Sequence, residues 1–516
     1  MFKHHKEWIL ILDYGSQVTQ LIARRIREQG VYCEIHPFNV ELSIFESNTP
    51  SGIVLSGGPK SVNEKHAPGF SSDIFKMDVP VLGICYGLQL VAHHLLPGSV
   101  AKAERREFGR AHLIIDEAGD LLNNIPQKST VWMSHGDHIK ELPDGFQIIG
   151  HTKNAAIAAI RHPKYQFWGV QFHPEVAHTE FGKQIFENFT HRICQLSDSW
   201  TAESFISTTL KEIKETVGDA KVICGLSGGV DSTVVATLVH QAIGDQLECI
   251  FVNNGLLRKN EFSDVLKLYK RDLKLPVRGI DASDRFLDRL QGVEDPERKR
   301  KIIGNTFIEV FDEAVEHTPE VRFLAQGTLY PDVIESVSFK GPSATIKSHH
   351  NVGGLPDKMN LELLEPVREL FKDEVRSVGR SLGIPDHFIA RHPFPGPGLA
   401  IRIISDVDRT KLKTLREVDH IFISELINSQ LYDEVWQAFA VLLPVQSVGV
   451  MGDERTYEFT AGLRAVTSVD GMTADWAHLP QPFLAKVSNR IINEVRGINR
   501  VVYDISSKPP STIEWE

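Results

Sequence analysis

Short β-rich apolar runs alternate with helix-like segments along two long stretches of the chain, and this alternation restricts the fold more than any other feature. The first series contains the strand-like runs WILILDYG, GIVLSGG and VPVLGIC, together with the helical patterns TQLIARRIREQG and GLQLVAHHL. The second series contains KVICGL, STVVATLVHQAI, LECIFVNNG and VRFLAQGTLYPD. Strands that alternate with helices form a parallel sheet covered by helices. The sequence therefore predicts two α/β domains, each built on a parallel sheet.

Two breaks in this pattern predict the domain boundaries. The polar segment HRICQLSDSWTAESF (191–205) carries Ser, Thr and Asp residues suited to capping a new helix. The segment HPFPGPGLAIR (392–402) concentrates Pro and Gly, which commonly separate domains. The predicted fold class is α/β and multidomain, with two parallel-sheet α/β domains followed by a smaller α+β domain. The predicted domains are 1–196, 197–391 and 392–516, which fits a usual domain size of about 100–200 residues.

Composition and charge argue against several classes of protein. The 56 Lys and Arg against 67 Asp and Glu give a net charge of −11, which disfavours a general nucleic-acid or anionic-membrane surface. No apolar run approaches the roughly 18 residues of a membrane span, and WILIL is too short for a signal-peptide core. The five cysteines form no CxxC pair, so neither a disulfide framework nor a zinc ribbon is supported. We expect a cytoplasmic enzyme that acts on small molecules and has no nucleic-acid or membrane partner.

A cysteine lies between two glycines where a predicted strand meets a helix. In VPVLGICYGLQL, Gly83 and Gly87 flank Cys85 as in a nucleophile elbow, and the N-terminus of the next helix favours a thiolate. His173 and Glu175 end the strand-like run WGVQFHPEV, and residues two apart on an extended chain face the same side. Glu175 can then accept from one imidazole nitrogen while the other faces a thiol. Each residue alone has an ordinary structural explanation, but together they predict a nucleophilic site.

The segment KVICGLSGGVDSTVVATL predicts a strand, a tight glycine turn and a helix. Backbone N–H groups in such a turn form an anion site, and Ser227, Ser232 and Thr233 add hydroxyl donors. The lysine of GxxxxGK[ST] is absent and Asp231 lies in the turn instead. Because a carboxylate beside phosphate requires a cation between them, Mg²⁺ bound by Asp231 is predicted. A glycine-rich turn capped by an Asp remains the alternative. The candidate phosphate-binding residues are Ser227, Gly228, Gly229, Val230, Asp231, Ser232 and Thr233.

Three further features are weaker candidates. Lys347, in ATIKSHHNVGGLP, could close over phosphates as a lid, or be a solvated loop lysine. The basic run ERKRK (297–301) could contact phosphate, although such a run is more often a solvated helix face. Asn253, at the end of a predicted strand, could contact ribose or adenine.

The first set of motifs resembles the class I glutamine amidotransferases, whose Gly-Gly-Pro loop, elbow and His-Pro-Glu segment occur here in the same order. The resemblance implies that Cys85 attacks the side-chain amide of glutamine, that His173 transfers protons and that Glu175 holds the imidazole. It also implies a glutamine pocket that SHGDH (134–138) helps to line. The implied oxyanion and glutamine-binding residues are Gly57, Gly58, Tyr86 and Gln89.

The turn SGGVDS resembles the pyrophosphate loop of the ATP pyrophosphatases, which cut ATP between its α- and β-phosphates. In this domain order, the chain resembles the glutamine-hydrolysing GMP synthetases. The segments that extend the resemblance are GTLYPDVIES (327–336), IKSHHNVGGLP (346–356), RHPFPGPGLAIR (391–402) and VVYDISSKPPSTIEWE (501–516). The family pattern makes 1–196 the amidotransferase, 197–391 the ATP pyrophosphatase and 392–516 the domain that dimerises and binds XMP.

The resemblance implies an overall reaction with glutamine, ATP and XMP as substrates. The 2-oxygen of XMP is adenylylated, pyrophosphate is released, and ammonia then displaces AMP to give GMP. It also implies a homodimer formed through the third domain, and contacts from Lys508 and Glu514 to XMP. Without the resemblance, both would be ordinary charged residues of a tail.

Other functions use parts of the same motifs. An NAD synthetase-like ligase amidates a carboxylate after adenylylation, but usually carries a nitrilase-like glutaminase. A sulfur-transferring tRNA enzyme would be expected to have a more basic surface and often paired cysteines. A catalytically dead protein that senses glutamine or nucleotide would not need the complete set of reactive residues. The ligase of another acceptor and the sensing protein remain alternatives.

Overall fold

The computed structural model describes the chain except for residues 1–4, 319, 338–360, 452–453, 469–470 and 472. The chain divides into two compact units. The first contains Met1–Phe205 and Pro331–Ile346, and the second contains Ile206–Tyr330 and Lys347–Glu516. Along the chain, α5 (Ala202–Val217) and α10 (Tyr330–Val337) cross from one unit to the other. The predicted second and third domains thus fall mainly within one unit.

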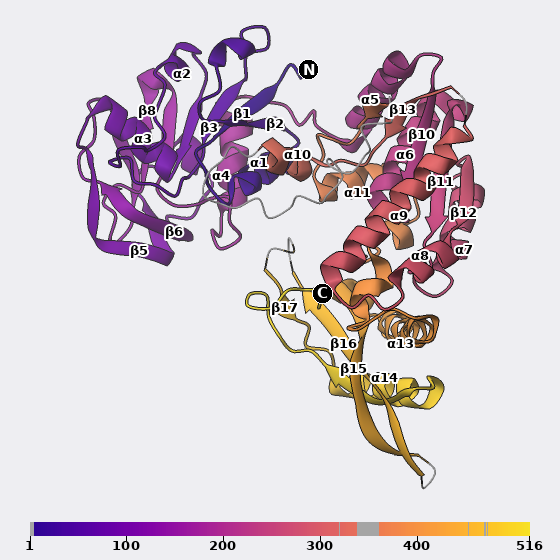
Figure 1. The fold of residues 1–516 in the computed structure, drawn as a ribbon. Coiled ribbons are helices and arrows are strands. Elements are labelled where there is room, and N and C mark those ends of the chain that lie inside the picture. The colour runs from indigo at the N-terminus through magenta and orange to yellow at the C-terminus, as the bar shows by residue number, and fades with distance from the viewer. Residues whose placement is uncertain (1–4, 319, 338–360, 452–453, 469–470, 472) are drawn as a thin grey trace. The chain divides into compact units, whose positions relative to one another are not determined.

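The first unit is built on a nine-stranded sheet in the order β2-β1-β3-β4-β9-β8-β7-β5-β6 (Figure 1). The first five strands in that order run parallel to one another, and the remaining pairs, beginning with β9 and β8, are antiparallel. The parallel strands are β1 (Trp8–Asp13), β2 (Tyr32–Pro37), β3 (Gly52–Leu55), β4 (Val81–Ile84) and β9 (Phe167–Val170). The antiparallel strands are β5 (Val100–Ile115), β6 (Lys128–Ile139), β7 (Gln147–His151) and β8 (Ala159–His162). The parallel half was predicted; the antiparallel half was not.

Helices cover the parallel part of this sheet. Every residue of β3 and β4 is buried, as expected for strands covered on both faces. Among the helices, α1 packs against α4 and β2, and α3 packs against β4. The helices of this unit are α1 (Thr19–Arg27), α2 (Asp73–Lys76), α3 (Tyr86–Leu95) and α4 (Gly182–Glu187). The first candidate site lies in the loops that follow the carboxyl ends of β3, β4 and β9.

The second unit contains a five-stranded, wholly parallel sheet in the order β12-β11-β10-β13-β14. This sheet confirms the second parallel series. Its strands are β10 (Lys221–Leu226), β11 (Leu247–Asn253), β12 (Val277–Asp281), β13 (Val321–Ala325) and β14 (Glu362–Leu364). The helices of this part are α6 (Val230–Ile243), α7 (Glu261–Lys267), α8 (Ser283–Leu290), α9 (Pro296–Glu316), α11 (Lys372–Ser381) and α12 (Asp386–Ile389).

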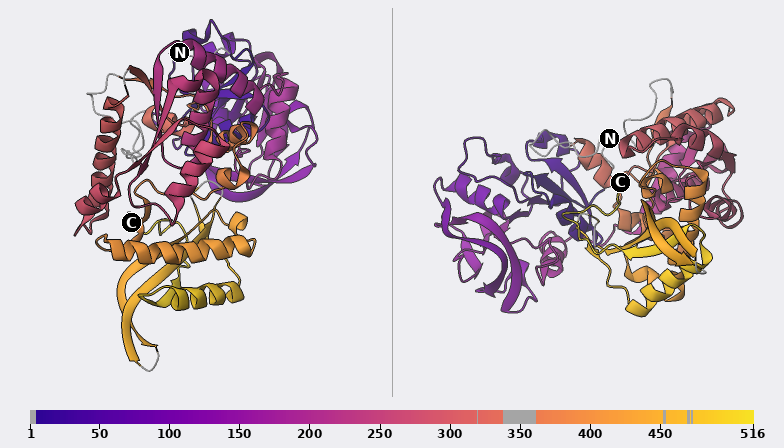
Figure 2. Two further views of the ribbon diagram at one scale, coloured as in Figure 1. Left: turned by 90° about the vertical axis from the view of Figure 1, so that its right-hand side faces the viewer. Right: turned by 60° about the horizontal axis from the view of Figure 1, so that its bottom comes forward.

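The same unit continues into a mostly antiparallel sheet with two long helices along it. The 3₁₀ helix η7 (Gly398–Arg402) precedes α13 (Arg409–Asn428), and α13 packs against α14 (Gln481–Glu494) as Figure 2 shows. The strands are β15 (Gln437–Met451), β16 (Glu454–Thr467), β17 (Asp475–Trp476) and β18 (Ile498–Tyr503). One continuous cluster of buried apolar side chains runs from β10 and β11 to α13 and α14. Within the described part of the chain, no helix is long and apolar enough to cross a membrane.

Candidate active sites

Cys85 occupies a strained turn between β4, which ends at Ile84, and α3, which begins at Tyr86. Its φ of 49° and ψ of −100° are rarely adopted by a residue with a side chain. Such a conformation costs of order 1–3 kcal/mol and is commonly found at functional sites. A Cβ on Gly87 would lie 2.5 Å from the Leu55 carbonyl oxygen, and one on Gly83 would lie 2.8 Å from the Leu88 nitrogen. The elbow predicted from the sequence is therefore present, and both flanking glycines are required for it.

His173 is hydrogen-bonded to Glu175, with 2.7 Å between Nδ1 and Oε1. Both residues are buried. Burial opposes protonation of His173, but hydrogen bonds with Cys85 and Glu175 and their charges raise the pKa of the imidazole to about 11. The pair lies in the turn after β9, which ends at Val170, and not on the extended strand that the sequence predicted. The raised pKa favours a protonated His173 imidazole, which lies between the Cys85 sulfur and the Glu175 carboxylate.

The Gly-Gly-Pro loop follows β3 and lies against the same residues. A Cβ on Gly57 would lie 3.2 Å from His173 Cε1, and a Cβ on Gly58 would lie 3.1 Å from Tyr86 Cγ. Tyr86 is buried, and its hydroxyl donates to the Pro68 carbonyl. The backbone of this loop thus lies close to the elbow, where the sequence predicts donors for an oxyanion.

A buried amide that the sequence reasoning missed contacts the thiol. Gln171 Nε2 lies 3.6 Å from Cys85 Sγ, and Gln171 Oε1 accepts from Gln89 Nε2 at 3.1 Å. Gln89 also donates to the Asp137 carbonyl at 3.0 Å, and Cys85 Sγ lies 3.9 Å from the Ser134 carbonyl oxygen. Gln89 is therefore part of an amide chain that ends at the nucleophile. The only sequence signal for Gln171 was its place two residues before His173.

The second glycine turn joins β10, which ends at Leu226, to α6, which begins at Val230. Gly228 has a φ of +80°, so a side chain there would be strained. The hydroxyl oxygens of Ser227 and Ser232 lie 3.1 Å apart. The Thr233 hydroxyl is turned inward, because it donates to the Gly229 carbonyl at 2.8 Å and lies 2.9 Å from the Tyr269 hydroxyl. The two serines are therefore better placed than Thr233 to offer hydroxyl groups to an anion.

Asp231 forms an ion pair with Lys372 at the start of α11. Its second carboxylate oxygen, Oδ1, is buried and without a hydrogen-bond partner in the described residues. Sequence reasoning missed Lys372, because it lies 141 positions away and no local pattern distinguishes it. A free carboxylate oxygen fits Mg²⁺, which is usually bound by one or two carboxylates together with substrate phosphates. No cluster of three or more His, Cys, Asp or Glu side chains with metal-binding geometry occurs among the residues described.

Two more side chains lie near the carboxyl-terminal edge of this sheet. Arg391 donates to the Gly228 carbonyl at 3.2 Å and forms an ion pair with Glu261. Asn253 donates to Asp281 Oδ1 at 3.2 Å and accepts from the Gly255 amide at 3.0 Å. Arg391 thus contacts the glycine turn itself, whereas Asn253 contacts the end of the neighbouring strand β12.

The remaining candidates lie in different surroundings. Lys347 falls outside the described residues. Lys508 Nζ donates to the Gly471 carbonyl at 2.8 Å. Glu514 accepts from Arg402 Nη2 at 2.8 Å and from Gln437 Nε2 at 2.8 Å. The two tail residues predicted to contact a nucleotide are therefore each held by a different part of the fold.

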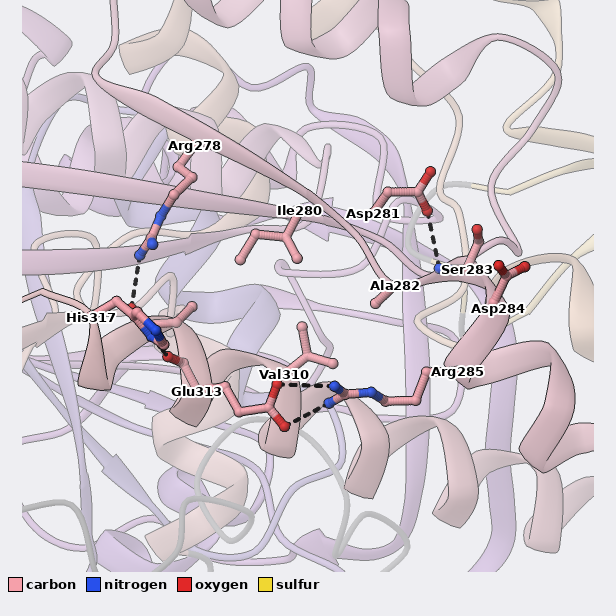
Figure 3. Close-up of a pocket in the computed structure, with 11 residues that line it drawn as sticks. Arg278, Ile280, Asp281, Ala282, Ser283, Asp284, Arg285, Val310, Glu313 and His317 are labelled. Carbon is pink, nitrogen blue, oxygen red and sulfur yellow. Dashed lines mark hydrogen bonds and ion pairs between the residues drawn. The ribbon is translucent and has the colours of Figure 1, made fainter.

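A cavity of about 440 Å³ lies along the edge strand β12, beside α8 and α9 (Figure 3). Several of its charged groups are paired with other side chains or with the backbone. Arg285 makes two hydrogen bonds with Glu313, at 2.7 and 3.0 Å, and Arg278 donates to the Ala314 carbonyl at 2.7 Å. None of the predicted site residues that the structure describes lines this cavity. We therefore assign the chemistry to the two glycine turns.

Comparison with known proteins covers the whole chain. The family model described as "Glutamine amidotransferase class-I" matches residues 10–193, "NAD synthase" matches 202–297 and "GMP synthase C terminal domain" matches 424–515. The chain is 57% identical to the glutamine-hydrolysing GMP synthase of Fusobacterium nucleatum, over 99% of this chain and 100% of that protein. Its identity to the enzyme of the same name from Chlorobaculum tepidum is 58%, over 98% and 99% of the two chains. For the enzyme of that name from Aquifex aeolicus, the identity is 57%, over 98% and 99%. The chain belongs to the family of glutamine-hydrolysing GMP synthases.

Proposed function

We propose that the protein converts XMP to GMP, using glutamine as the nitrogen donor and ATP as the activator. The observation that carries this proposal is the elbow cysteine Cys85 beside His173, which is hydrogen-bonded to Glu175, on the same chain as the SGGVDS turn. A glutaminase joined to an ATP-cleaving site can supply ammonia to an acceptor that has been activated by adenylylation. The full-length similarity to GMP synthases identifies XMP as the acceptor to test.

In the glutaminase reaction, the Cys85 sulfur attacks the side-chain carbonyl carbon of glutamine. The C–N bond then breaks, a thioester forms and His173 protonates the departing nitrogen, so that ammonia leaves. Backbone N–H groups of the Gly57–Gly58 loop and Tyr86 stabilise the oxyanion. Once Cys85 is acylated, its contribution to the raised pKa of His173 is lost. The imidazole can then deprotonate the water that releases glutamate.

In the synthetase reaction, the turn from Ser227 to Thr233 binds the phosphates of ATP. Asp231 would bind Mg²⁺ through its free oxygen, and Mg²⁺ would supply the positive charge that offsets that of the phosphates. Lys372 already contacts Asp231 and can offer a second positive charge to the same phosphates. The 2-oxygen of XMP attacks the α-phosphorus and pyrophosphate leaves. Ammonia then forms the new C–N bond as AMP departs.

The third predicted domain, 392–516, is proposed to bind XMP and to form a homodimer. Lys508 and Glu514 are the proposed XMP contacts, and Lys347 the proposed lid residue. The dimer is supported by exposed apolar side chains on β15, β16 and β18, since such a surface favours protein association. These side chains are Val445 (58% exposed), Val448 (52%), Val450 (74%), Tyr457 (61%) and Val502 (40%). The same proposal includes Mg²⁺ as the metal ion and a cytoplasmic location. It also includes the domain boundaries 1–196, 197–391 and 392–516.

The experiment is incubation with ATP, Mg²⁺, XMP and glutamine, followed by chromatography of the nucleotides. We expect GMP and AMP to appear together, and neither to appear without XMP. The match to NAD synthase over residues 202–297 makes another acceptor the second candidate. Formation of AMP with a carboxylate acceptor, and none with XMP, would favour that candidate. A protein that only senses its ligands would form no product with any acceptor.

A further inference from the structure

Lys299, within the basic run 297–301, is completely buried. The sequence reading of this run as a solvated helix face is therefore wrong for this residue. Its ammonium group makes three hydrogen bonds, to the Ala400 carbonyl at 3.2 Å, the Ile403 carbonyl at 2.8 Å and Glu516 Oε2 at 2.7 Å. A lysine ammonium has three donors, so all of them are used. A charge removed from water in this way is retained only where its partners are well placed.

The partners of Lys299 lie on two segments that also meet each other. Ala400 and Ile403 flank Arg402 in and just after η7. Arg402 is itself fully buried and holds Glu514 through two hydrogen bonds, at 3.1 and 2.8 Å. Lys299 therefore holds η7, which carries Arg402. It also holds Glu516, which lies two residues after Glu514, the partner of Arg402. The result is a closed network between α9, η7 and the segment 504–516.

The segment 504–516 contains no helix and only one isolated bridge, between Lys508 and Ala474. Its conformation therefore depends on side chains from elsewhere. The fully buried Arg464 donates to the carbonyls of Ile513, Ser506 and Thr512 at 2.9, 3.0 and 3.0 Å. Arg402 Nη1 is buried without a hydrogen-bond partner among the described residues. An unpaired buried donor costs free energy, which is unusual for a network that serves stability alone.

We propose that Lys299 is a positioning residue for the acceptor-nucleotide site, acting through Glu516 and Arg402 on Glu514. This inference rests on the proposed function, in which Lys508 and Glu514 of the segment 504–516 contact XMP. Lys299 does not touch the nucleotide; it sets where the carboxylate of Glu514 lies. Because α9 belongs to the ATP-cleaving part of the unit, the same lysine ties the acceptor segment to that part.

The test compares Michaelis constants in Lys299→Met, Glu516→Gln and the double variant, with ammonium as nitrogen source. Loss of a hydrogen bond to a charged group corresponds to about 10-fold to 100-fold in binding. We expect the KM for XMP to rise by about that factor in Lys299→Met and by less in Glu516→Gln, which can still accept a hydrogen bond. The KM for ATP should change by less than about 2-fold. The double variant should be no worse than Lys299→Met, since coupled residues are not additive.

Lys486→Met is the matched control, because Lys486 also pairs with a buried carboxylate, Glu425, at 2.7 Å. It should leave the KM for XMP unchanged, and Lys299→Arg should restore part of the loss. If Lys299→Met fails to fold, Glu516→Gln and Lys299→Arg carry the test. An unchanged KM for XMP, or an equal rise for ATP, would overturn the inference while the wild type still made GMP. If the wild type makes no GMP from XMP, the proposed function fails and the inference fails with it.

Discussion

The tripeptide Ser-Gly-Gly follows a buried parallel strand twice in this molecule, after β3 and after β10, and the two copies are built differently. In the first, Gly57 and Gly58 pack against His173 and Tyr86, and the helix behind the site comes from the neighbouring strand. In the second, the chain runs directly from the turn into α6. The first arrangement suits a single oxyanion beside a fixed cation. The second presents a turn, a helix N-terminus and Asp231 to a larger anion.

The two sites also differ in their charges. His173 has its pKa raised to about 11, so the first site contains its own positive charge. In the second site, Asp231 is paired with Lys372 and keeps one carboxylate oxygen free. This site can therefore bind a metal ion, whose charge would add to that of Lys372. Identical tripeptides thus do not imply identical ligands. We propose that the residues that follow the tripeptide, and those contributed by distant elements, determine which anion each turn binds.

The largest expected effect is a loss of activity with glutamine, but not with ammonium, when the first site is disabled. Cys85→Ala removes the nucleophile and should lower glutamine-dependent GMP synthesis by at least about 10⁴-fold. Synthesis from added ammonium should be retained, because that reaction uses only the second site. Rates of GMP formation with each nitrogen source measure this. Equal loss of both activities would contradict the division of labour.

Asp231→Asn should impair the second site and leave the glutaminase site intact. A metal ion at a phosphate contributes several kcal/mol, so pyrophosphate release should fall by about 10²-fold to 10³-fold with either nitrogen source. A coupled pyrophosphate assay measures the rate, and basal glutamine hydrolysis serves as the internal control. Normal pyrophosphate release in this variant would remove the assigned role of Asp231.

Gly87→Ala tests whether the elbow requires glycine. The new Cβ would lie 2.5 Å from the Leu55 carbonyl oxygen, which belongs to a buried strand and cannot move freely. We expect a loss of about 1–3 kcal/mol in unfolding free energy, together with lower glutaminase activity. Gly69→Ala is the control, because a Cβ there meets nothing within 4 Å. Equal melting temperatures for the two variants would show that the close contact is relieved without cost.

The finest test concerns the charge of His173. Nitrogen NMR of the ring should show it protonated through neutral pH, with deprotonation near pH 11 in the wild type. In Cys85→Ala, the hydrogen bond and charge of the cysteine are absent, so the pKa of His173 should fall. Because the folded pKa is raised above the usual 6.5, the favourable interaction is complete below about pH 6.5 and is lost as the pH rises through about 11. An unchanged titration in the variant would mean that Cys85 does not raise this pKa.

The sequence predicted what depends on local chemistry. The elbow at Cys85 and the partnership of His173 with Glu175 follow from short spacings, and the second parallel sheet follows from its alternating pattern. Contacts between distant residues could not be predicted in this way. Lys372 reaches Asp231 only because α11 packs beside α6, and Lys299 is buried only because η7 and the segment 504–516 close over it.

Two local features of the structure differ from what the sequence pattern alone indicates. The Thr233 hydroxyl, which the sequence predicts to face an anion, donates to the Gly229 carbonyl and contacts the Tyr269 hydroxyl in this structure. The antiparallel half of the first sheet was not anticipated, because β6 alternates buried and more exposed residues and lacks the continuous apolar run that marks parallel strands such as β3 and β4.

The most direct test of the account follows one nitrogen atom through both sites. Wild-type protein is incubated with ATP, Mg²⁺, XMP and glutamine labelled with ¹⁵N in its side-chain amide, and the products are examined by mass spectrometry. We expect the GMP to carry ¹⁵N in its 2-amino group, and one AMP to form for each GMP. Release of labelled ammonia without labelled GMP, or AMP formed without any change in XMP, would contradict it.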